Sequence, residues 1–235
     1  MNILTNLFKS SLGRKFIMGL TGLALFGFVI GHLAGNLLIF FGADSINAYG
    51  AFLKGTGKLL WGARIGLIVC VGLHIWAGIT LTMENREARP VPYANPDPPE
   101  AGFGSRYMAI SGLVILAFII YHLLHFTFFT QWVNGTGLNF HELADDQGRH
   151  DIYEMLVLGF RVPIVSLFYL IAVGLLSVHL SHGVMAMFQS LGLRTKGWAD
   201  VISRGAKLFA ILIFIGYASI PLAVVFRFVG ADIGS

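Results

Sequence analysis

Four long apolar segments of this chain each carry a histidine well inside them: His32, His74, His122 and His182. An ionisable side chain at membrane depth is costly unless it is paired or ligated, so such residues are functional candidates. Neutral imidazole is a good ligand for iron, and a low-dielectric interior keeps imidazole neutral. Four imidazoles can supply two axial pairs. The pattern therefore predicts two bis-histidine haems, while hydrogen bonding between helices is the alternative for any one histidine.

The composition indicates that these histidines belong to a membrane protein. Of the 235 residues, 56% are apolar and only 12% are charged, whereas about a quarter of the residues of a soluble domain are charged. The net charge of +4 comes from basic residues near helix ends, so we interpret it as helix orientation and predict no nucleic-acid partner. Cys70 is the only cysteine and no C-x-x-C-H sequence occurs, so any haem is held non-covalently.

Five segments are long enough to cross a bilayer, which takes roughly 20 apolar residues. They are residues 16–41, 61–83, 106–130, 162–188 and 206–228. We predict an all-α integral membrane protein, with 1–235 as a single domain of five transmembrane helices, four of which form a haem-binding bundle. The proline-rich segment 84–105 is predicted to be an extended loop.

Basic residues distinguish the two sides of the membrane. With five spans, ten Lys and Arg residues fall on the side of the N-terminus and six on the other side. Cytoplasmic loops carry the excess of Lys and Arg, so we predict the N-terminus inside and the C-terminus outside. The acidic segment 131–151 then lies outside.

A helical rise of about 1.5 Å per residue converts sequence position into depth. His32 and His122 each follow the start of a span by about sixteen residues in helices of the same direction, which places both in the outer half. His74 and His182 lie near the inner ends of helices of the opposite direction. The depths therefore pair His32 with His122, and His74 with His182. His125 and His179 lie three residues from a named ligand on the same helix face, so either can replace it.

The small residues Gly27, Gly31 and Gly35 form a stripe beside His32. Small residues give a flat macrocycle room, but they also permit ordinary close packing of helices. Both interpretations of the stripe stay open.

The order of several short motifs resembles one known family. These motifs are Ser11-x-x-Arg14-Lys15 with Thr21-Gly22, Gly31-His32-Leu33-x-Gly35-Asn36-Leu37, Gly42 with Ile46-Asn47-Ala48-Tyr49, Leu73-His74, Tyr121-His122-Leu123-x-His125-Phe126, and His182-Gly183. Over nearly its whole length the chain resembles the five-helix, di-haem cytochrome b subunit of succinate:quinone oxidoreductases, the family that includes quinol:fumarate reductases.

The resemblance implies two b haems, a distal one held by His32 and His122 and a proximal one held by His74 and His182. It favours His182 over His179 and His122 over His125. It also implies a flavoprotein with FAD and an iron–sulfur subunit, both docked on the cytoplasmic face of a bacterial inner membrane. Menaquinone or ubiquinone would be the substrate. The chain itself has no Rossmann glycine motif and no cysteine cluster, so it binds neither FAD nor an iron–sulfur centre.

Two further sets of residues are candidates for binding. Haem propionates are carboxylates that pair with basic and hydroxyl groups near the headgroups. The propionate candidates are Arg14, Ser105, Arg106, Arg161 and Arg194. The quinone candidates in the outer loops are Asn47, Tyr49 and Glu142. One characterised member of the family uses a glutamate at the outer end of the second helix, and this chain has none there, which leaves the proton carrier open.

Rival functions predict other features. The di-haem cytochrome b of a formate dehydrogenase or hydrogenase would also transfer electrons, but the Asn47-Ala48-Tyr49 loop and the histidine order speak against it. A histidine-relay transporter would show internal repeats and intramembrane acidic groups; no Asp or Glu falls inside a span. An anchor without haems would not need four histidines at matched depths.

Overall fold

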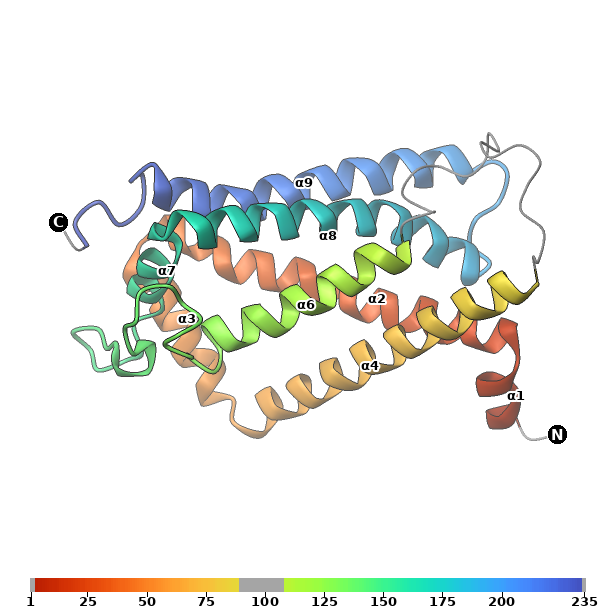
Figure 1. Cartoon of the computed structure of the whole chain (residues 1–235), viewed down its shortest axis with the longest axis horizontal. Coiled ribbons are helices and arrows are strands. Elements are labelled where there is room, and N and C mark those ends of the chain that lie inside the picture. The colour runs from red at the N-terminus through yellow and green to blue at the C-terminus, as the bar shows by residue number, and fades with distance from the viewer. Residues whose placement is uncertain (1–2, 89–107, 234–235) are drawn as a thin grey trace. The chain divides into compact units, whose positions relative to one another are not determined.

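Five helices of the structure are long and apolar enough to cross a membrane. The computed structural model describes residues 3–88 and 108–233. The five helices are α2 (Ser11–Asn36, continued by the 3-10 helix η1, Leu37–Phe41), α4 (Lys58–Glu87), α6 (Met108–Phe126), α8 (Pro163–Ser190) and α9 (Ala199–Val225) (Figure 1). In the described ranges the one β pairing is an isolated bridge between Ala144 and His150. The predicted all-α fold with five spanning helices is thus confirmed.

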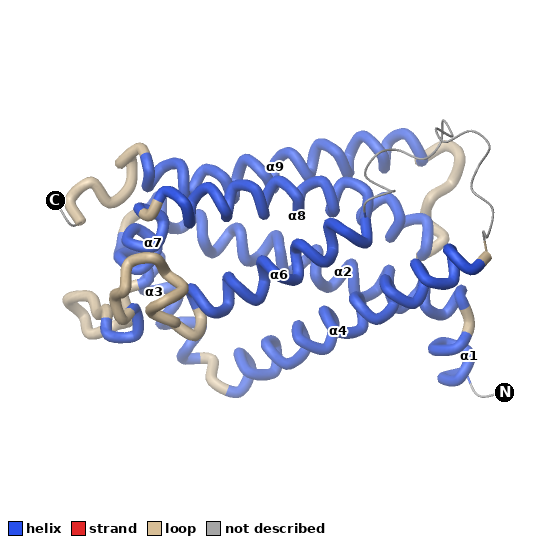
Figure 2. Tube along the Cα trace, viewed as in Figure 1, coloured by secondary structure: helices blue, strands red, loops and turns tan. Residues whose placement is uncertain are grey.

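Segments outside the five predicted spans also form helices (Figure 2). These are α1 (Ile3–Lys9), α3 (Ala43–Gly55), η2 (Phe140–Glu142) and α7 (Ile152–Arg161). Helix α7 begins at a capped terminus, because the Asp151 carboxylate accepts from the backbone N–H of Glu154 at 2.9 Å. Helix α3 follows Gly42, whose φ of 96° suits glycine because it has no Cβ to clash.

The ends of the spans differ from the predicted ends. Helix α4 continues through Glu87, so the extended loop predicted from residue 84 is wrong for its first four residues. Polar residues continue a helix beyond the hydrocarbon core because each new residue adds a backbone hydrogen bond. Helix α6 ends at Phe126 rather than near 130, and Phe129 then adopts a left-handed φ of 53°. The rest of the predicted proline-rich loop, residues 89–105, lies outside the described residues.

The chain divides into two compact units, and each long helix contributes to both. Unit 1 contains the described residues of Met1–Phe28, Arg64–Leu113 and Ser177–Ala210. Unit 2 contains those of Val29–Ala63, Val114–Leu176 and Ile211–Ser235. His74, His179 and His182 therefore belong to unit 1, whereas His32, His122 and His125 belong to unit 2.

Unit 1 has a small apolar core. Val184, Met187 and Ala206 are buried there, and Phe26 and Phe188 pack against them. Large apolar side chains elsewhere remain exposed on the spanning helices, among them Ile68 at 70%. An exposed apolar surface on helices of this length is the surface that lipid would cover.

Unit 2 has a larger core, in which the short helices take part. Ile39 of η1, Ile46 of α3 and Val157 of α7 are 1%, 3% and 0% exposed. Because these side chains are buried together, α3 and α7 lie side by side. Asp44 and Asn47 of α3 are thereby brought close to residues 145–151 at one end of this unit.

Candidate functional site

His32 and His122 lie next to each other in unit 2. Their ring centroids are 5.7 Å apart and the ring planes meet at 85°. Two metal–imidazole bonds of about 2 Å each, plus the distance from each nitrogen to its ring centre, would separate two axial ligands by roughly 6 Å between centroids. The separation of this pair therefore fits two ligands of one haem iron.

Tyr169 of α8 holds His122 from the side. Its hydroxyl lies 3.3 Å from His122 Nδ1 and 3.1 Å from His125 Nδ1. A hydroxyl has one proton to donate and lone pairs to accept with. Tyr169 can therefore accept from His122 Nδ1–H and donate to His125 Nδ1. That arrangement leaves the His122 Nε2 lone pair available for a metal, in the way that outer partners usually fix a ligating imidazole.

His125 is packed too closely to serve as the ligand in place of His122. The residue is 0% exposed, and its ring stacks on Phe126 with centroids 3.8 Å apart. Its Nε2 is buried without a hydrogen-bond partner among the described residues. A Cβ added at Gly159 of α7 would lie only 2.9 Å from this nitrogen, so helix α7 covers the atom that would have to reach iron.

In unit 1, His74 has a hydroxyl partner. Thr21 of α2 lies 3.2 Å from His74 Nδ1 and donates its own proton to the Ile17 carbonyl at 2.7 Å. The Thr21 oxygen therefore accepts from His74 Nδ1–H, which leaves Nε2 of the neutral ring without a proton. Gly22 also faces this ring, because a Cβ there would lie 3.4 Å from His74 Cε1.

His179 has the same arrangement as His74. Ser111 of α6 lies 3.0 Å from His179 Nδ1 and donates to the Met108 carbonyl at 3.0 Å. His179 is within electrostatic reach of both His74 and His182. The structure thus brings all three histidines into one neighbourhood, and it gives His179 the better-defined tautomer. The sequence motif favours His182, so both stay candidates opposite His74.

The stripe formed by Gly27, Gly31 and Gly35 has free space beside its first two glycines and the Tyr49 ring beside the third. A Cβ at Gly27 or Gly31 would meet nothing within 4 Å, whereas one at Gly35 would collide with the Tyr49 ring at 2.6 Å. Tyr49, a quinone candidate, is therefore packed on α2 at Gly35. Gly35 therefore needs to be small for this packing.

Three propionate candidates already have protein partners. The Arg14 guanidinium is paired with the Glu84 carboxylate, and Arg161 donates to the carbonyls of Gly230 and Ile233. Arg194 is exposed and contacts the Gln189 side chain at 3.4 Å. The two remaining candidates, Ser105 and Arg106, lie outside the described residues.

Asn47 is enclosed in a polar network at the end of unit 2 where α3 and α7 lie. It is 1% exposed. Its Oδ1 accepts from the backbone N–H groups of Ile152 and Tyr153 at 2.9 and 3.0 Å. Its Nδ2 donates to Asp151 at 3.1 Å and to Asp145 at 3.3 Å. All of its hydrogen-bonding groups are used within the protein, which is the arrangement of a structural residue. Glu142, the third quinone candidate, is exposed and accepts from Asn139.

Asp145 and Arg149 close a short hairpin beside this network. The Arg149 guanidinium donates to Asp145 at 2.7 Å and to Asp44 of α3 at 2.8 Å. Desolvation alone would raise the pKa of Asp145, but hydrogen bonds from Arg149, Gln147 and Asn47 outweigh it and lower that pKa. The same two carboxylates raise the pKa of Arg149.

This lowered pKa predicts how the hairpin responds to acid. A carboxylate whose pKa is depressed by folding contributes stability above its unfolded value of 3.8, and the contribution is lost as pH falls through the folded value. We expect amide hydrogen exchange at Gly148 to remain slow as the pH is lowered past 3.8. In Arg149→Gln, fast exchange should begin at a higher pH. An identical pH profile in both proteins would contradict this role of the ion pair.

Several of these residues escaped sequence reasoning. Tyr169, Thr21 and Ser111 are polar side chains inside apolar spans, and that was the available signal, but nothing in the sequence says which histidine each one faces. Helix α7 had a clearer signal, because Asp151 followed by Glu154 is a typical helix start. Comparison with protein-family models, with curated proteins and with solved structures finds no match for this chain.

Proposed function

We propose that the chain is the membrane anchor and electron-transfer subunit of a succinate dehydrogenase or fumarate reductase, with two b haems between an iron–sulfur subunit and the quinone pool. The observation that carries this proposal is the His32–His122 pair, whose ring separation of 5.7 Å fits two axial ligands. The order of the sequence motifs supports the family assignment. His74 with His182, or with His179 in its place, would hold the second haem.

Bound haem b supplies one-electron transfer across the bilayer. The residues of the chain orient the ligands and keep them neutral. The Tyr169 hydroxyl binds Nδ1 of His122, and the Thr21 hydroxyl binds Nδ1 of His74. The Tyr169 hydroxyl is also hydrogen-bonded to Nδ1 of His125. Dicarboxylate chemistry belongs to the FAD flavoprotein, because this chain has no flavin motif. The exposed basic residues Arg86, Arg194 and Lys196 support docking of the partners on the cytoplasmic side of a bacterial inner membrane.

A redox spectrum tests the function itself. The purified chain is mixed with a soluble naphthoquinol, a menaquinol analogue, and the visible spectrum is followed. We expect the sharp α band of reduced haem b to appear, and reoxidation once a quinone is added in excess. A histidine-relay transporter would show no such band with either reagent.

Removing the Tyr169 hydroxyl should alter the distal haem without removing it. A hydrogen bond from Nδ1–H makes the ligating imidazole more basic and so favours oxidised iron. In Tyr169→Phe we therefore expect full haem content and a raised midpoint potential for one haem, measured by redox titration. Thr21→Val is the matched variant, and it should raise the potential of the other haem. If Tyr169→Phe left both potentials unchanged, Tyr169 would not hold a ligand.

A further inference from the structure

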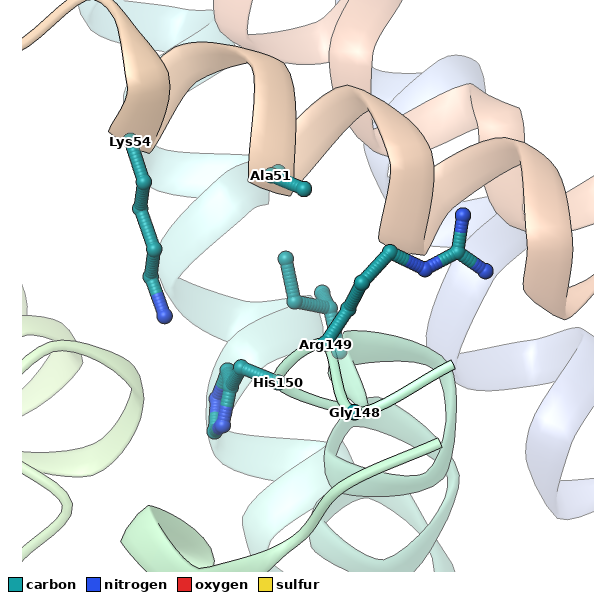
Figure 3. Close-up of a pocket in the computed structure, with 7 residues that line it drawn as sticks. Ala51, Lys54, Gly148, Arg149 and His150 are labelled. Carbon is teal, nitrogen blue, oxygen red and sulfur yellow. The ribbon is translucent and has the colours of Figure 1, made fainter. Parts of the chain in front are cut away.

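Two cavities lie at the outer end of unit 2, and they share a wall. One has a volume of about 320 Å³ and lies between α3 and residues 148–152; Figure 3 shows its lining. The other, about 210 Å³, reaches Phe129 and residues 141–144. Lys54, Gly148 and His150 line both. We call these two spaces the outer cavities.

His150 presents an unpaired nitrogen there. Its Nδ1 lies 3.2 Å from the Leu143 carbonyl oxygen. A carbonyl can only accept, so Nδ1 must carry the proton, and the neutral ring has a bare lone pair on Nε2. This Nε2 is buried and has no hydrogen-bond partner among the described residues. A buried acceptor without a partner is destabilising, so the position is unfavourable unless the atom has a use.

The surroundings keep this imidazole neutral and ready to accept a proton. Burial, and then the positive charge of Lys54, lower the pKa of His150. His141 lowers it further, whereas the Leu143 carbonyl and the Asp151 carboxylate act in the opposite direction. In Figure 3 the Lys54 side chain extends toward His150, while the Arg149 guanidinium points away to its carboxylate partners.

Phe129, which lines the second outer cavity, has an unusual backbone conformation. Its ring lies 5.0 Å from that of His150 and 6.0 Å from that of His141. Its φ of 53° is uncommon for a residue with a large side chain, and strained residues of this kind gather at functional sites. This left-handed backbone places the Phe129 ring beside the imidazole ring of His150.

We propose that Nε2 of His150 exchanges protons with the quinone at the outer cavities, as base in quinol oxidation and as acid in the reverse reaction. This inference rests on the proposed function. When a quinol is oxidised, its two O–H bonds break, two electrons pass to the iron centres of the complex, and two protons leave. His150 takes them one at a time and releases each to water in the cavities. Two separate bases are not required for the two protons, because the imidazole of His150 can accept and release one proton twice in each turnover.

The experiment compares His150→Asn with Asp146→Asn in the haem-loaded complex. Asparagine keeps a donor for the Leu143 carbonyl but has no group that titrates. With the naphthoquinol as substrate, we expect full haem content in both variants. The rate in His150→Asn should fall roughly 10²-fold, the lower end of general-base catalysis, and its dependence on acid pH should vanish. Asp146 is exposed and lines neither of the outer cavities, so its variant should behave as wild type.

Chemical rescue separates proton transfer from structure. In His150→Ala, added imidazole should restore a large part of the rate, because it supplies the missing base in the enlarged cavity. A wild-type rate and pH profile in His150→Asn would overturn the inference, as would a slow His150→Ala that imidazole does not rescue. If the wild-type chain binds haem and oxidises quinol, and His150→Asn does so equally well, this inference fails while the proposed function stands. A wild-type chain without haem or quinol oxidation overturns the proposed function, and this inference with it.

Discussion

Replacing His122 by alanine should remove one of the two haems, whereas replacing His125 should leave both in place. His122 faces His32 across 5.7 Å, so its loss takes away one of two axial ligands. His125 Nε2 is covered by α7 at Gly159 and its ring contributes packing and one hydrogen bond to Tyr169. We expect haem b per folded chain to fall by half in His122→Ala and in His32→Ala.

The matched variant for this comparison is His125→Asn, which keeps a polar group toward Tyr169. Haem content should be unchanged, and the Soret and α bands of the distal haem should shift slightly because an amide replaces the imidazole as the partner of Tyr169. Folding is monitored by circular dichroism in the same detergent. Loss of a haem in His125→Asn, with retention in His122→Ala, would reverse the assignment of the ligand.

The second large effect concerns Asn47, which we expect to be structural. In Asn47→Leu, the backbone N–H of Tyr153 loses its acceptor, and that of Ile152 keeps only the His150 carbonyl at 3.1 Å. A buried donor left unsatisfied costs about 1–3 kcal/mol, so the free energy of unfolding should fall by about that amount. Thermal unfolding in detergent measures the change. Gln147→Leu, at an exposed position, should stay within about 0.5 kcal/mol of wild type.

Asn47→Asp distinguishes the two halves of the amide. The remaining oxygen still accepts from α7, but the Nδ2 donor becomes a carboxylate oxygen facing Asp145 and Asp151. Like charges in one site repel, so we expect this variant to be destabilised at neutral pH and to recover as pH falls. If Asn47 instead bound quinone, its variants would keep wild-type stability and lose quinol oxidation.

The spans were predictable, because an apolar run of about 20 residues has few structural alternatives to a membrane helix. The matched depth of His32 and His122 was also predictable from the sequence, since helical rise converts sequence position into depth, and the structure places their rings next to each other. Their role as haem ligands stays a prediction.

Lateral contacts were not predictable in this way. The covering of His125 depends on Gly159, which is 34 residues away in a helix that the sequence analysis did not predict. Asn47 was expected in a quinone site because the sequence predicted an outer loop there, whereas it belongs to α3. Its partners belong to residues 145–153, and only tertiary structure shows that they use every hydrogen bond of the amide.

The most direct test of the whole account is the haem b content of the purified wild-type chain, measured as the pyridine haemochrome and divided by the protein concentration. Two haems per chain are predicted. His74→Ala should then lose one haem and His32→Ala the other, with midpoint potentials identifying which remains. A folded chain that contains no haem when expressed with haem in excess would contradict the central claim.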